Sequence, residues 1–221
     1  ETILEQLGFA VTRSEYQDSR SVEKSNLLAV RMPAGEQANG EQANGEQAGL
    51  AYFAHTDVVP AEKWVGPGTG DSDPFTAQIN EGRLYGRGAC DMKGSLAAML
   101  SAAARVDPKE QTAPLWLACT ADEEVGFEGA KHLVGHCQEY RKLVASDPMT
   151  IIGEPTLLRV VHAHKGIHGF KVISEGRAAH SATTHGINAN EAMVPMLVKL
   201  LELCQRTRSD ASLQDNRFDP P

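Results

Sequence analysis

The run LAYFA at Leu50–Ala54 is a continuous apolar segment of strand length, and LWLACT at Leu115–Thr120 is a second. Runs of this kind predict strands in a sheet that is covered on both faces. Between them, Gly94–Val106 is rich in alanine and has helical spacing. Strands that alternate with helices in this way predict an α/β domain, of α/β/α architecture with a largely parallel or mixed central sheet.

Shorter segments on either side extend this pattern. Phe9–Thr12 and Asn26–Met32 are apolar-rich and bounded by polar residues, which predicts two further strands. Glu128–His136 has a helical pattern, and Thr150–Gly153 predicts a short strand. Gly35–Gly49 repeats the unit GEQAN without a large apolar residue, so we expect a solvated loop there.

The character of the sequence changes after residue 165. Gly169–Ser174 predicts a strand, and Asn188–Cys204 predicts an amphipathic helix that contains Pro195. One strand and one helix cannot bury both of their faces alone, so we expect the first β–α unit of a smaller α+β domain. The sequence therefore predicts two domains, residues 1–165 and an incomplete 166–221.

The composition narrows the classes of partner. Lys and Arg number 21 against 29 Asp and Glu, and the net charge of −8 has the wrong sign for a nucleic-acid backbone. No apolar run approaches the roughly 18 to 20 residues of a membrane span, and no leader pattern opens the chain. The four cysteines are widely spaced without a CxxC pair, which favours a reducing cytoplasm over a disulfide framework. We expect neither a nucleic acid nor a membrane as partner.

Polar residues recur directly after the apolar strands, where open α/β sheets build their sites. His55-Thr-Asp57 follows the first run, and Asp57 is close enough in sequence to orient the imidazole of a metal-binding histidine. Alone, this pattern also occurs in purely structural roles. The glycine-rich turn Gly86–Gly94 presents Asp91 before a helix and lacks the Lys-Ser/Thr pair of a P-loop, so it suits a cation better than a phosphate.

Consecutive acids follow the run LWLACT, namely Asp122, Glu123 and Glu124, and Glu154 follows the short strand after them. Neighbouring carboxylates repel one another near a dry core unless cations neutralise them or one binds a proton. A solvated acidic turn is the alternative interpretation. One imidazole and several carboxylates, without thiolates, suit zinc, cobalt or manganese.

Several motifs in a fixed order resemble one enzyme family. They are HTDVVP, GRLYGRGACDMKG, ADEEVG, IIGEPT, AHKG and AAHSA, spread between Leu50 and Met193. Together they resemble the dinuclear-zinc deacylases and peptidases, which include acetylornithine deacetylase, succinyl-diaminopimelate desuccinylase, aminoacylase and glutamate carboxypeptidase. The resemblance implies a hydrolase that uses two divalent metal ions to cleave the amide bond of a small N-acylated amino acid, most like acetylornithine deacetylase.

The same resemblance assigns the metal ligands. His55 and Glu154 would bind one ion, Glu124 would bind the other, and Asp91 would bridge the two. Zinc is the expected metal, with cobalt or manganese as alternatives. In this family a cis peptide bond follows the bridging aspartate, so we expect one between Asp91 and Met92.

Three further residues receive catalytic roles from the resemblance. Glu123 would be the general base that takes a proton from a metal-bridged water and passes it to the leaving amine. Asp57 would orient His55. His180, in AAHSA, matches a histidine of the lid or dimerisation domain that reaches the partner's active site in family homodimers and stabilises the oxyanion.

The family pattern also sets limits on this sequence. Its last metal ligand is a downstream histidine that the sequence lacks, together with most of the lid. We therefore expect weak binding of the second ion and little activity from this length of chain beside the full-length homodimer. Desuccinylase, aminoacylase and dipeptidase or carboxypeptidase activities remain alternatives, and a non-catalytic binding or dimerising relative is the alternative from another class.

Overall fold

The computed structural model describes residues 1–34, 49–67 and 73–218. It divides into two compact units, Glu1–Leu158 and Arg159–Pro221, which are described separately. The repetitive segment for which a solvated loop is predicted lies outside the described residues, apart from its last glycine, Gly49.

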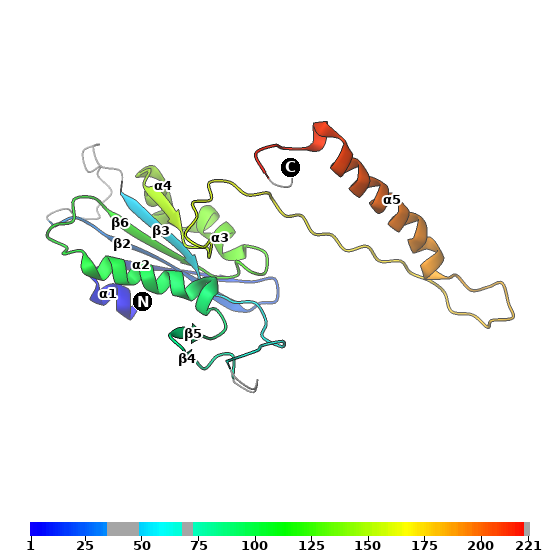
Figure 1. Cartoon of the computed structure of the whole chain (residues 1–221), viewed down its shortest axis with the longest axis horizontal. Helices are drawn as coiled ribbons and strands as arrows, with labels where there is room; N and C mark the ends of the chain where they lie inside the picture. Colours follow the sequence, from blue (N-terminus) through cyan, green and yellow to red (C-terminus); the bar gives the residue numbers. More distant parts are fainter. Residues whose placement is uncertain (35–48, 68–72, 219–221) are drawn as a thin grey trace. The chain divides into compact units, whose positions relative to one another are not determined.

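The first unit is built on a five-stranded sheet with the order β1-β2-β6-β3-β7 (Figure 1). Strands β6, β3 and β7 run parallel, whereas β1 and β2 pair antiparallel with each other and β2 pairs antiparallel with β6. The sheet is therefore mixed, which confirms the predicted α/β class. The strand bounds are Ala10–Gln17 for β1, Glu23–Arg31 for β2, Leu50–His55 for β3, Leu115–Thr120 for β6 and Met149–Ile152 for β7.

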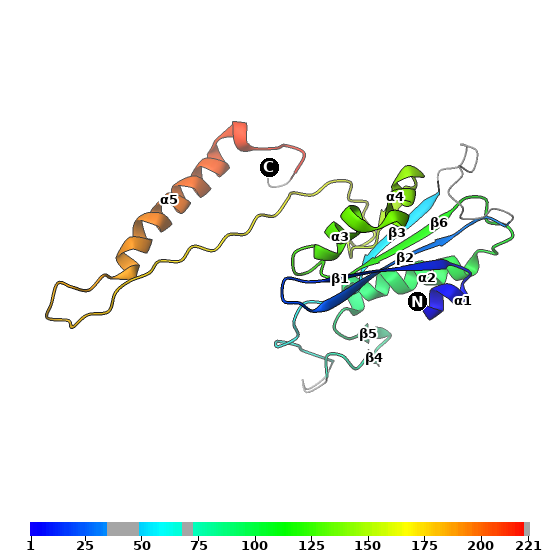
Figure 2. The ribbon, with the colours of Figure 1, turned by 180° about the vertical axis from the view of Figure 1, so that it is seen from behind.

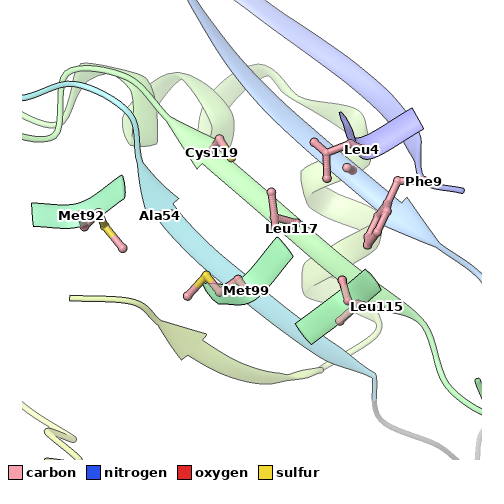
Figure 3. Packing of buried hydrophobic residues seen from close by; sticks show 10 residues of the cluster. Leu4, Phe9, Ala54, Met92, Met99, Leu115, Leu117 and Cys119 are labelled. Atoms are coloured by element: carbon pink, nitrogen blue, oxygen red, sulfur yellow. The ribbon is translucent and has the colours of Figure 1, made fainter. Parts of the chain in front are cut away.

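Strand β6 lies in the middle of this sheet and is buried from both sides. Alternate side chains of a strand point to opposite faces, so Leu115 and Leu117 pack on one face with Met99 of helix α2, Gly94–Arg105 (Figure 3). Helix α1, Thr2–Gln6, adds Leu4 to this cluster.

The opposite face of the sheet is covered by two other helices. They are α3, Glu128–His136, and α4, Gln138–Ala145. Leu133 of α3 and Leu143 of α4 pack against Trp116 of β6. Figure 2 shows α2 on one side of the sheet and α3 and α4 on the other, the predicted three-layer arrangement. The runs LAYFA and LWLACT became adjacent parallel strands because both faces are covered by apolar helix surfaces.

The segment between β3 and α2 contains a small hairpin that the sequence patterns did not predict. Strands β4, Gln78–Asn80, and β5, Arg83–Tyr85, pair antiparallel. Their two-residue turn has positive φ at Glu81 and Gly82, the conformation that suits the twist of a tight hairpin. After it, the helical turn Ala89–Lys93 leads into α2.

The second unit contains one long helix, α5, Ala189–Ser209, and the short helical turn Ala211–Leu213. The side chain of Asn188 accepts a hydrogen bond from the amide of Asn190 and caps α5, which confirms the predicted helix. The predicted strand Gly169–Ser174 is wrong: among the described residues it pairs with no other strand. Its backbone lacks a neighbouring strand to hydrogen-bond, and apolar content alone does not make a strand.

In the part of the chain that the structure describes, no helix has both the length and the apolar character needed to cross a membrane.

Replacing Leu133 by alanine should destabilise the first unit by roughly 2–5 kcal/mol, because the side chain is 1% exposed and its loss leaves a cavity under the sheet. Urea unfolding measures this change. Val134→Ala is the matched control, since Val134 follows on the same helix and is 60% exposed, so we expect a change within about 0.5 kcal/mol. Similar losses in both variants would contradict the packing described for α3.

Candidate metal centre

The predicted site residues of the first unit gather at one edge of the sheet. His55 is the last residue of β3, the acidic turn 121–124 follows β6, and Glu154 lies just beyond β7. Because these three strands are parallel neighbours, their carboxyl ends meet at the same edge. Asp91 joins them from the helical turn before α2.

His55 is the buried nitrogen donor of this group, with its side chain 2% exposed. Its Nε2 lies 3.0 Å from Oδ1 of Asp91, and its Nδ1 lies 3.0 Å from the backbone oxygen of Asp57. Burial works against the charged imidazolium, but the hydrogen bonds to Asp91 and Asp57 outweigh it and raise the pKa of His55. The ring is thus held between two acceptors.

Asp91 is carried by a turn whose backbone has two unusual features. Gly88 has a φ of 81°, a conformation that favours glycine, and the peptide bond between Asp91 and Met92 is cis. The predicted cis peptide is therefore confirmed. Met92 is buried against the sheet, while the side chain of Asp91 is 50% exposed and faces the other acids.

Three of the predicted ligands lie close enough to share a metal ion. One donor atom each from His55, Asp91 and Glu124 lies within 4.8 Å of the others. Glu154 lies beside them, with its Oε1 4.0 Å from Nε2 of His55. Two ligands of a tetrahedral zinc ion lie about 3.4 Å apart, so small side-chain rotations would bring these donors around an ion. One imidazole with carboxylates is a donor set that zinc, cobalt and manganese accept.

Burial and neighbouring acids disfavour the ionisation of Glu123 and Glu154. Burial raises the pKa of Glu123, and the nearby charges of Glu124, Asp57 and Asp91 raise it further, although His55 opposes them. Burial and the charge of Asp91 likewise raise the pKa of Glu154. A divalent cation between these groups would remove the repulsion, so the electrostatics fit the donor geometry.

The sequence position of Asp57 suggests that its carboxylate contacts His55, but the carboxylate instead bonds to the turn after β6. Its carboxylate accepts hydrogen bonds from the amides of Glu123 and Glu124, at 3.2 and 3.0 Å. Its Oδ1 is 3.6 Å from Nδ1 of His55, farther than its own backbone oxygen. Asp57 therefore ties the turn after β6 to the turn after β3.

Asp122 is separated from the two acids that follow it. Its carboxylate is buried beneath the sheet edge, where Lys24 donates to it at 2.7 Å and Tyr16 at 2.8 Å. Burial and the hydrogen bond to Asp122 raise the pKa of Tyr16. Sequence patterns missed Lys24 and Tyr16, because they lie on β1 and β2, roughly a hundred positions away.

Asn26 secures the same turn from the other side. It is 0% exposed, accepts a hydrogen bond from the amide of Ala121 and donates one to the carbonyl of Gly129. A side chain at Gly129 would collide with the backbone oxygen of Ala121. The chain that carries Glu123 and Glu124 is thus fixed by side chains from strands of both directions.

His180 belongs to the second unit, Arg159–Pro221. It is exposed, and its Nδ1 accepts a hydrogen bond from the amide of Ala182. Its assignment to the oxyanion therefore stays a prediction.

A buried imidazole and convergent acids at the carboxyl edge of parallel strands define a candidate metal-dependent enzyme of the α/β class. The chain belongs to the peptidase family M20/M25/M40, whose sequence profile matches residues 51–214. The family resemblance seen in the motifs is thereby confirmed.

Curated relatives agree with this family membership. The chain is 36% identical over 198 residues to the acetylornithine deacetylase of Yersinia pseudotuberculosis, covering 89% of this chain and 46% of the relative. It is 33% identical over 207 residues to the acetylornithine deacetylase of Proteus mirabilis, covering 93% and 47%. The chain thus spans about half the length of these relatives.

Among solved structures, human carnosine dipeptidase 1 has a similar fold. The TM-score is 0.51 at 24% identity, over 68% of this chain and 30% of that one. At this identity the likeness supports the α/β fold alone.

Glu123→Gln should stabilise the metal-free chain near neutral pH, because it removes a charge that the folded state disfavours. Since the folded pKa of Glu123 lies above its usual value of 4.5, the folded state binds the proton more tightly than the unfolded state. The wild-type chain should therefore lose stability as the pH rises from about 4.5 through the raised pKa. Urea unfolding of both proteins between pH 4 and 8 tests this, and a constant difference between them would contradict it.

Lys24→Met should destabilise the chain by roughly 3 kcal/mol, because it leaves the carboxylate of Asp122, which is 4% exposed, without its ion-pair partner. Lys142→Met is the matched control on the surface. The ion pair between Lys142 and Glu139 spans 3.9 Å and is accessible to solvent on both sides. Removing the charge of Lys142 should therefore cost less than about 1 kcal/mol. Urea unfolding compares the two, and an equal effect would argue against a structural role for the Lys24 pair.

Proposed function

We propose that this chain carries most of the catalytic centre of a metal-dependent hydrolase that cleaves the amide bond of an N-acylated amino acid. The observation that carries the proposal is the convergence of His55, Asp91 and Glu124, with Glu154 beside them, at one edge of the sheet. Family membership and the acetylornithine deacetylases among its relatives support this reaction over others.

In this proposal the four side chains divide between two divalent ions. His55 and Glu154 would hold one ion, Glu124 would hold the other, and Asp91 would contribute to both. The half-exposed side chain of Asp91 and its place among the other donors support the bridging role. Zinc is the metal that we propose, because nitrogen and oxygen donors in this number suit it, with cobalt and manganese as substitutes.

Glu123 is the general base of the proposed reaction. Such ions, when bound, lower the pKa of water and polarise the carbonyl group of the amide. Glu123 accepts a proton from the attacking water and delivers it to the nitrogen of the leaving amine, so it is regenerated in each cycle. Its raised pKa supports this role, because a carboxylate whose pKa is raised accepts a proton more readily.

Asp57 acts in this scheme as a positioning residue. Its carboxylate accepts hydrogen bonds from the amides of Glu123 and Glu124, and its backbone oxygen contacts the ring of His55. Asp57 therefore links the proposed base to two proposed metal ligands. Asp57 thus fixes the distance between the two turns that carry the centre.

The remaining assignments concern the second domain. We propose that residues 1–165 form the catalytic domain and that residues 166–221 begin a lid or dimerisation domain. His180 would stabilise the oxyanion of a neighbouring subunit in a cytoplasmic homodimer. Exposed apolar residues along α5, such as Leu197 and Leu201, support an interface on this helix.

The zinc-loaded protein at its full natural length should hydrolyse N-acetylornithine, and Glu123→Gln should lower kcat by roughly 100-fold or more while zinc still binds. Glu128→Gln is the control. Glu128 is an exposed acid at the start of α3, so this variant should retain activity. Assays with N-acetyl, N-succinyl and dipeptide substrates discriminate between deacetylase, desuccinylase and dipeptidase. Zinc binding without turnover of any amide would contradict the proposal and favour a non-catalytic relative.

A further inference from the structure

A cavity of about 340 Å³ adjoins the metal centre on the side of β5. Asp91 and Glu124, two of the proposed ligands, line one end of it. Its volume lies in the range of pockets that bind small ligands. A molecule bound at the metal centre would therefore extend into this cavity.

The other walls of the cavity are mostly apolar. Val59, Trp64, Leu84 and Tyr85 contribute side chains, and the remaining wall is the turn that begins at Gly86. These residues come from the loop after β3 and from the hairpin strand β5. Such walls suit a short hydrocarbon arm, because apolar surface removes it from water.

Arg87 is the cationic residue of this lining. Its guanidinium carbon lies 5.7 Å from the ring centroid of Trp64, and its backbone amide donates to the carbonyl of Pro74. Its Nε is buried and has no hydrogen-bond partner among the described residues. A planar guanidinium fits a carboxylate with two parallel hydrogen bonds, which the two Nη groups of Arg87 can donate.

We propose that this cavity binds a carboxylate-bearing arm of the substrate and that Arg87 recognises the carboxylate. The proposal rests on the proposed function for the position of the scissile amide, and it assigns this cavity to a carboxylate of the N-acylated amino acid. The ring of Trp64, with its centroid 5.7 Å from the guanidinium carbon, restrains the position of Arg87.

Succinate binding, with succinamide as the uncharged counterpart, tests the proposal through the fluorescence of Trp64. The other tryptophan, Trp116, is 6% exposed in the core and supplies a constant background. The chain should bind succinate more tightly than succinamide. Arg87→Met should weaken succinate binding by roughly tenfold or more and leave succinamide binding unchanged, with Arg87→Lys intermediate.

Arg83→Met is the matched control, since Arg83 lies on β5 outside the cavity lining and its loss should change neither affinity. Unchanged succinate affinity in Arg87→Met would overturn the proposal. An equal loss of both ligands, no succinate binding by the wild-type chain, or tighter binding of putrescine would also overturn it. Measurements with and without zinc separate the two proposals: absent zinc binding contradicts the metal centre, whereas the succinate-to-succinamide ratio of the metal-free chain still decides the role of Arg87.

Discussion

The repulsion among carboxylates gathered around one buried imidazole is the constraint on which this structure depends. Asp91, the pair Glu123 and Glu124, and Glu154 come from three separate parts of the chain and lie near His55 at the edge of the sheet. Burial, and after it the charges of neighbouring acids, raise the pKa values of Glu123 and Glu154, so their ionisation in the folded chain carries a cost. The fold tolerates that cost because divalent ions would convert the repulsion into attraction.

The scaffold around the centre keeps the acids in place by fixing their backbone. The carboxylate of Asp57 accepts hydrogen bonds from the amides of Glu123 and Glu124. The carboxylate of Asp122 accepts hydrogen bonds from Lys24 and Tyr16 of the antiparallel strands. These bonds run to buried or partly buried groups, where a lost partner is expensive. The antiparallel half of the sheet thus supports the acids that the parallel half presents. Preorganised acids bind an ion without paying for rearrangement.

The sequence predicted the parts of the fold that depend on local pattern. The apolar runs at Leu50 and Leu115 became the central parallel strands, and acids after strand ends met because neighbouring parallel strands end at one edge. Contacts between distant residues left no local signal, so the anchoring of Asp122 by Lys24 was missed. The predicted strand Gly169–Ser174 failed because apolar content does not supply a hydrogen-bonding neighbour.

Equilibrium dialysis of the metal-stripped chain against zinc tests the central claim most directly. The wild-type chain should bind at least one zinc ion, and Asp91→Asn should weaken binding by roughly tenfold or more, because a carboxylate of the proposed centre is lost. Asp107 is an exposed aspartate in the turn after α2, so the control variant Asp107→Asn should bind zinc like the wild type. Equal zinc affinity in all three proteins, or none in the wild type, would contradict a metal centre built on His55 and these acids.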